Sequence, residues 1–209
     1  MVRYGISLTN FDVLILPSGR YGRMLDDDTI DGLKAWVRKG GKVIAIGNAV
    51  GSFAGKDDFG IEENSDDDED DDEETEEANL TPYDQRERDN VKNLITGSIY
   101  KTTIDSSHPM AFGYENIYYS LKLGGNSFKL LNSGYNVGYI KGDPVSVSGF
   151  SGEDAKAGLA NSVTFAEKRI GSGSVIYLVD DVLFRSFWEN GKLFLVNSIF
   201  FVNNNMFTL

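Results

Sequence analysis

The stretch that decides the fold is DVLILPSGRYGRMLDDDTIDGLKAWVRKGGKVIAI, Asp12–Ile46. It begins with the apolar run DVLIL and ends with a second run, KVIAI, and both are typical of strands buried on two faces. Between the runs, four apolar residues share one face of a predicted helix: Ile30, Leu33, Trp36 and Val37. A helix that joins two such strands forms a right-handed crossover, which predicts a parallel sheet.

Other segments add to this unit. Val163–Arg169 and Ser174–Val179 flank a glycine turn and predict a hairpin, whereas Trp188–Val202 predicts an apolar helix that packs across the sheet. Over Val2–Leu8, apolar residues alternate with polar or small ones, which is typical of a half-buried strand, and this segment leads into the next strand without a crossover. We therefore expect an α/β domain over residues 1–202, with a first strand and helix upstream, and a tail over residues 203–209.

Charge is concentrated in one segment. The chain has no cysteine and a net charge of −12, and Asp66–Glu77 holds eleven carboxylates, so removing eleven negative charges leaves −1. Such a run repels itself, and we expect residues 56–81 to form an acidic, disordered inserted loop. No basic stripe suggests nucleic-acid binding, and no apolar run has the length of a membrane span.

The turn after the second buried run is the place for a catalytic elbow. A glutamine-amidotransferase elbow would place its nucleophile at Gly47, which has no side chain to attack with. A serine triad also needs a G-x-S-x-G elbow and a histidine base, and no serine of this chain stands in that pattern. We expect a plain strand-to-loop turn and no catalytic residue.

His108, the one histidine, precedes Pro109 in a loop. It could serve as a base or a pH switch, or it could be a loop residue bonded to nearby backbone, which we favour. One histidine cannot supply the nitrogen ligands of a catalytic zinc site, so we expect no metal in this chain.

Several polar side chains follow the predicted strands, where ligands bind in open α/β sheets. They could line a crevice for a sugar or peptide: Arg20, Tyr21, Asn48, Asp180, Asp181 and Arg185. For the last three, the alternative is an ion pair of Arg185 with either aspartate, or a cap of the final helix.

These patterns resemble the flavodoxin-like core of the class I glutamine amidotransferase-like superfamily. More specifically, the chain resembles the C-terminal domain of a group of bacterial zinc carboxypeptidases that are common in Bacteroidetes. Besides the acidic insertion, the similarity lies in SSHPMAFGY (106–114), YSLKLGG (119–125), GYNVGYI (134–140), VSGFSG (147–152) and the apolar run 174–202. The resemblance implies a three-layer sandwich with a mostly parallel sheet, extended by β-hairpins.

It also implies a function. In that group zinc is bound by a separate upstream peptidase domain, and the amidotransferase-like domain lacks the catalytic triad of its superfamily. Glycine at position 47, where the nucleophile would stand, agrees with such a loss. The expected role is that of a non-catalytic accessory domain of a secreted or periplasmic metallocarboxypeptidase, with the peptidase domain as its partner. The alternatives are a sugar- or peptide-binding module and a free-standing hydrolase with an unrecognised site.

Overall fold

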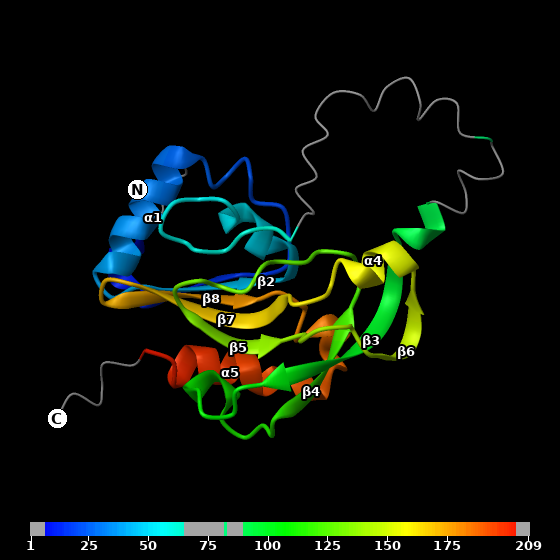
Figure 1. Cartoon of the computed structure of the whole chain (residues 1–209). Helices are drawn as coiled ribbons and strands as arrows, with labels where there is room; N and C mark the ends of the chain where they lie inside the picture. The colour runs from blue at the N-terminus through cyan, green and yellow to red at the C-terminus, as the bar shows by residue number, and fades with distance from the viewer. Residues whose placement is uncertain (1–6, 65–81, 83–89, 204–209) are drawn as a thin grey trace.

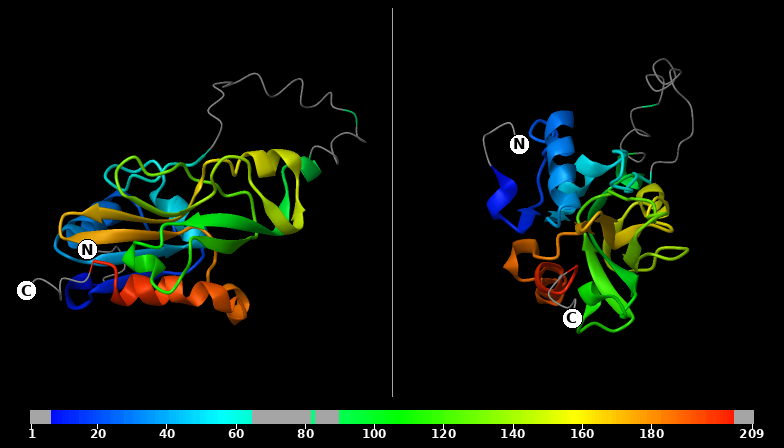
Figure 2. Two further views of the ribbon diagram at one scale, coloured as in Figure 1. Left: turned by 60° about the horizontal axis from the view of Figure 1, so that its bottom comes forward. Right: turned by 90° about the vertical axis from the view of Figure 1, so that its left-hand side faces the viewer.

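The computed structural model describes residues 7–64, 82 and 90–203. Within these residues, eight strands form one mixed sheet with the order β1-β2-β8-β7-β5-β3-β4, and β6 pairs with β3 beside β5. Helix α1 covers one face of the sheet and helix α5 covers the opposite face, whereas β3, β4 and β6 lie at the far end from α1 (Figures 1 and 2).

The bounds of the elements are as follows. The strands are β1 Val13–Leu16, β2 Lys42–Ile46, β3 Ile95–Ile104, β4 Ile117–Lys122, β5 Tyr135–Tyr139, β6 Ser146–Ser151, β7 Val163–Ile170 and β8 Gly173–Leu178. The α-helices are α1 Asp27–Arg38, α4 Glu153–Ala157 and α5 Lys192–Phe200. The 3₁₀ helices are η1 Leu8–Asn10, η2 Gly47–Phe53, η4 Pro109–Ala111, η5 Phe184–Ser186 and η6 Glu189–Gly191.

The crossover predicted from Asp12–Ile46 is confirmed, but only its second strand is buried on both faces as predicted: the first is an edge strand in which Ile15 is 38% exposed. β1 and β2 pair in parallel with Ile15 opposite Ile44, and α1 joins them. The helix is capped by Asp26, whose carboxylate accepts a hydrogen bond from the Thr29 N–H at 3.1 Å. β8 lies parallel to β2 on its other side, with Ile44 opposite Ile176.

The expected flavodoxin-like sandwich with a mostly parallel sheet is wrong. Only the β1–β2 and β2–β8 pairs are parallel, and the other five pairs are antiparallel. The physical reason lies in the connections, because a parallel pair needs a crossover of about a dozen residues or more, usually a helix. β7 instead returns into β8 through a tight turn, which confirms the predicted hairpin and starts the antiparallel half of the sheet.

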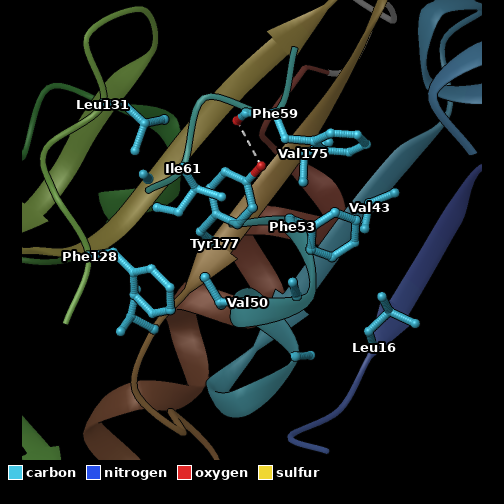
Figure 3. Close-up of a cluster of buried hydrophobic side chains, with 14 of the residues drawn as sticks. Leu16, Val43, Val50, Phe53, Phe59, Ile61, Phe128, Leu131, Val175 and Tyr177 are labelled. Carbon is cyan, nitrogen blue, oxygen red and sulfur yellow. Dashed lines mark hydrogen bonds between the residues drawn. The ribbon is translucent and has the colours of Figure 1, made fainter. Parts of the chain in front are cut away.

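Alternate residues of the parallel strands build two cores. Val43 and Val175 point toward α1, where they pack with Ile30, Leu33 and Val37. Ile44 and Ile176 point the other way and pack with Phe194 of α5. Figure 3 shows the first core, in which the Tyr177 hydroxyl donates a hydrogen bond to the Phe59 carbonyl at 2.9 Å.

Residues 56–64 belong to the folded part of the chain, although we expected the acidic insertion to begin at residue 56. Phe59 and Ile61 are buried in the first core, and the Gly55 N–H donates to the Ile61 carbonyl at 2.9 Å. Residues 65–81, with the acidic run, and 204–209 of the predicted tail lie outside the described residues. Among the helices that the structure describes, none is both long and apolar enough to cross a membrane.

Candidate ligand-binding crevice

The carboxyl ends of the three parallel strands meet at one edge of the sheet. Ser18 follows β1, Gly47 and Asn48 follow β2, and Asp180 and Asp181 follow β8. Ligands of open α/β sheets bind outside such strand ends. Asn48, Asp180 and Asp181 thus lie at a common edge as predicted, whereas Ser18 was not expected there.

The turn at Gly47 is closed by Ser18. Gly47 has a φ of +56°, and a Cβ on it would lie 2.6 Å from the Ser18 Oγ. That hydroxyl oxygen accepts a hydrogen bond from the Asn48 N–H at 3.2 Å. The nucleophile position of an elbow is thus occupied by a residue for which both the backbone conformation and the nearby Ser18 side chain favour glycine.

Two polar hollows lie along this edge. The outer hollow has a volume of about 560 Å³, and its walls include Arg20, Tyr21, Asn48, Ser52, Glu63 and Asn126. The inner hollow has a volume of about 250 Å³, and its walls include Ser18, Gly47, Asn48, Asn126, Asp180 and Asp181. We call the two hollows together the strand-end crevice.

Asn48 and Asn126 line both hollows. The Asn126 Nδ2 donates a hydrogen bond to the Asn48 Oδ1 at 2.8 Å. This leaves the Asn48 Nδ2 without a hydrogen-bond partner in the described part of the chain. Asn126 belongs to the loop between β4 and β5, which sequence reasoning did not connect with the crevice because 77 residues separate it from Asn48.

The charged side chains of the outer hollow have no counter-ion in the described part of the chain. Among the described residues, neither Arg20 nor Glu63 takes part in an ion pair, and both side chains are exposed. Tyr21 is half-buried, and its hydroxyl donates to the Pro17 carbonyl at 3.0 Å, which fixes the ring at the rim. The outer hollow thus offers a cationic donor, an anionic acceptor and an aromatic ring.

Asp180 is held by a buried lysine. The Lys122 Nζ lies 2.9 Å from the Asp180 Oδ1, and the two side chains are 1% and 9% exposed. The other oxygen, Oδ2, is buried and has no hydrogen-bond partner in the part of the chain that the structure describes. Lys122 gives no signal in the sequence, because an alternating strand predicts its exposure only if the register is known.

The predicted alternative, an ion pair of Arg185 with one of the two aspartates, is therefore wrong, because the lysine that pairs with Asp180 is Lys122. Asp181 caps the following turn, since its Oδ1 accepts a hydrogen bond from the Leu183 N–H at 3.0 Å. Arg185 lies over the Phe184 ring, with 5.1 Å between its Cζ and the ring centroid. Arg185 lines neither polar hollow and faces an adjoining apolar one.

His108 is confirmed as a loop residue bonded to nearby backbone. The Met110 N–H donates to its Nδ1 at 3.2 Å, so the ring proton is assigned to Nε2, which donates to the Glu167 Oε2 at 2.9 Å. Both side chains are buried, and His108 lines neither hollow of the crevice. Its geometry is that of a structural contact between η4 and β7.

Comparisons with known proteins give only distant similarity. No family model matches the chain, and no curated protein matches it. Three solved structures align with it: a cytoplasmic protein from Salmonella typhimurium (12% identity, TM-score 0.46), a β-galactosidase from Bacillus circulans sp. alkalophilus (9%, 0.48) and an exo-β-1,4-mannosidase from Opitutaceae bacterium strain TAV5 (14%, 0.39).

These alignments cover 92–93% of this chain, but 72% of the Salmonella protein, 23% of the β-galactosidase and 25% of the mannosidase. None of the three is an amidotransferase-like domain of a carboxypeptidase. Because every TM-score is below 0.5, the similarities support no argument about function. The family resemblance seen in the sequence therefore stays a prediction.

Proposed function

We propose that the chain is a non-catalytic module that binds a polar ligand in the strand-end crevice. The observation that supports this proposal is a hollow that contains both a donor and an acceptor, Arg20 and Glu63, neither of which is ion-paired within residues 7–64, 82 and 90–203. Binding sites of this kind combine a shaped cavity with a few placed polar groups that fix the ligand's orientation.

The chemistry of the walls favours a ligand that carries both hydrogen-bond donors and acceptors, and the Asp181 carboxylate of the inner hollow adds to the acceptors. The Arg20 guanidinium and the Asn48 Nδ2 donate, whereas the Glu63 carboxylate accepts. The Lys122–Asp180 pair adds no net charge to the floor. Sugars and peptides both meet these requirements, because hydroxyl and amide groups supply donors and acceptors together.

A binding role rather than catalysis is supported by the elbow. Gly47 supplies no nucleophile, and the chain has no cysteine. His108 is engaged by Met110 and Glu167 and does not line the crevice. A general base must lie within hydrogen-bond reach of the group it deprotonates.

On the resemblance alone, we extend the proposal to the parent protein. There the module would be an accessory domain of a secreted zinc metallocarboxypeptidase-family protein, and it would support the peptidase domain or hold its substrate or partner. Zinc would belong to that upstream domain, where it would polarise the peptide carbonyl and activate water. An open reading frame for a zinc-peptidase domain upstream of Met1 would support this extension, and its absence would contradict it.

The experiment is isothermal titration of the full chain with a panel of neutral sugars and short polar peptides. We expect at least one class to bind, and Asn48→Ala to weaken it by about tenfold, the effect of a lost hydrogen bond of about 1–1.5 kcal/mol. Asn132→Ala is the matched control, because Asn132 is exposed and lies outside the crevice.

A second measurement tests the absence of catalysis. The chain is incubated with carboxypeptidase substrates, with and without zinc, and we expect no turnover. Failure of every ligand to bind would refute the binding role, and metal-dependent turnover would refute the non-catalytic role.

A further inference from the structure

An apolar groove continues from the crevice across the exposed face of β3 and β4. It consists of two adjoining hollows of about 500 and 640 Å³, which share Ile99, Phe187 and Trp188. The first of them also shares Leu121, Leu123 and Phe184 with the inner hollow of the crevice. The walls thus change from the polar crevice, through a mixed hollow that Thr96, Ser148 and Arg185 also line, to a mainly apolar hollow beside Tyr119 and Val147.

The groove exposes large apolar side chains. β4 alternates in burial: Tyr118, Ser120 and Lys122 point into the protein, whereas Tyr119 and Leu121 point to the groove. The most exposed members are Tyr119 at 45%, Leu123 at 46%, Val147 at 51% and Phe187 at 60%. Contiguous exposed apolar surface of this kind marks interaction sites.

The wall opposite the sheet is held in a costly conformation. Arg185 and Ser186 have φ angles of +49° and +59°, which non-glycine residues rarely adopt. The segment is fixed at its far end, where the Trp188 Nε1 donates to the Tyr118 hydroxyl at 2.9 Å. Such local strain persists where the surroundings enforce it, and it concentrates at ligand clamps. Here it places Phe187 and Trp188 beside the groove.

Resting on the proposed function, we propose that the ligand is an extended peptide with a polar half in the strand-end crevice and apolar side chains in this groove. A peptide supplies amide groups and apolar side chains along one line, which matches a depression that is polar at one end and apolar at the other. Several wall residues of the groove are aliphatic, among them Ile99, Leu121 and Val147, and these suit leucine- or phenylalanine-like side chains better than sugar rings.

The test uses blocked octapeptides, acetylated and amidated. One half of each peptide consists of serine and asparagine, and the other half has leucine or phenylalanine at alternate positions, in both sequence orders. Matched peptides carry alanine in place of leucine and phenylalanine. A third probe, octyl glucoside below its micellar concentration, represents a sugar with an apolar substituent. Binding to the full chain is measured by titration calorimetry and by the fluorescence of Trp188 in a Trp36→Phe background.

We expect an apolar peptide to bind at least about tenfold tighter than its alanine counterpart, because each buried leucine or phenylalanine contributes on the order of one such factor. Phe187→Ser should remove most of this difference. Phe11→Ser should keep it, since Phe11 is similarly exposed, at 57%, but lies outside the groove.

Equal affinity for both peptide types would overturn the inference while leaving the crevice as a binding site. The same holds if octyl glucoside binds and the peptides do not, since the ligand would then be a glycoside. If no peptide and no sugar binds, the proposed function itself fails.

Discussion

The buried pair of Lys122 and Asp180 permits a quantitative prediction. In Lys122→Met the Asp180 carboxylate keeps its burial, at 9% exposure, but loses the Lys122 ammonium at 2.9 Å, its one ionic partner among the described residues. Its second oxygen already has no partner among the described residues, so neither oxygen would then be satisfied. Removing one member of a buried pair costs about 3–5 kcal/mol, and we expect a loss of unfolding free energy in that range.

The double variant Lys122→Met/Asp180→Leu separates charge from packing. Because hydrophobic replacement of a whole buried pair is often neutral or stabilising by about 1–4 kcal/mol, we expect it to recover most of the loss. Lys192→Met is the control: its partner Glu189 is 75% exposed, so its loss should stay below about 1 kcal/mol. Equilibrium unfolding in urea, followed by circular dichroism, measures all three. A loss below about 1 kcal/mol in Lys122→Met would show that the pair is solvated in solution, and the reasoning would be wrong.

Three further predictions use the same assay. Gly47→Ala places a Cβ 2.6 Å from the Ser18 Oγ at a φ of +56°, so we expect a loss of about 1–3 kcal/mol, part of which Ser18→Gly should restore; an unchanged midpoint would contradict this. His108→Ala leaves the buried Glu167 without its 2.9 Å partner and should cost about 1–3 kcal/mol, with less lost in His108→Gln; equal losses in the two variants would refute the hydrogen-bond argument. Burial raises the pKa of Tyr177 well above 10.0, so above pH 10 the unfolded chain binds fewer protons and stability falls by about 1.4 kcal/mol per pH unit. Unfolding at pH 9, 10 and 11 should show a shallower fall in Tyr177→Phe, and an identical slope would count against the assignment.

The parallel part of the fold could be predicted because its signals are local. The runs at Val13–Leu16 and Val43–Ile46 are apolar without interruption, and the helix between them has one apolar face. Apart from the β7–β8 hairpin, whose turn is a local signal, the pairing of the later strands could not be predicted, because it depends on contacts that the sequence does not encode locally. Residues 82–95, for example, have a helical pattern that predicts Val91, Leu94 and Ile95 as core residues. In the structure Ile95 is the first residue of β3, opposite Ser151, and Val91 and Leu94 are exposed.

The candidate site also contains residues that could be predicted from the sequence and residues that could not. Arg20 and Tyr21 lie in the loop after β1 and Asn48 lies in the turn after β2, and the structure brings them to one hollow. Lys122 and Asn126 reach the site from an antiparallel strand and the loop after it, so only knowledge of the sheet order could have identified them. Arg185 was predicted on the same grounds as Asp180, but a left-handed turn carries it to the apolar side.

The position of β8 between β2 and β7 has a consequence for how the chain acquires its structure. β2 and β8 are separated by more than 120 residues, and in the sheet the parallel strands join the antiparallel ones only through β8. During synthesis, therefore, the amino-terminal crossover must wait with one edge of β2 open until residue 178 has left the ribosome. Pairings between such distant segments form slowly and leave partly folded chains prone to association, so expression with chaperones or at low temperature should favour the native state.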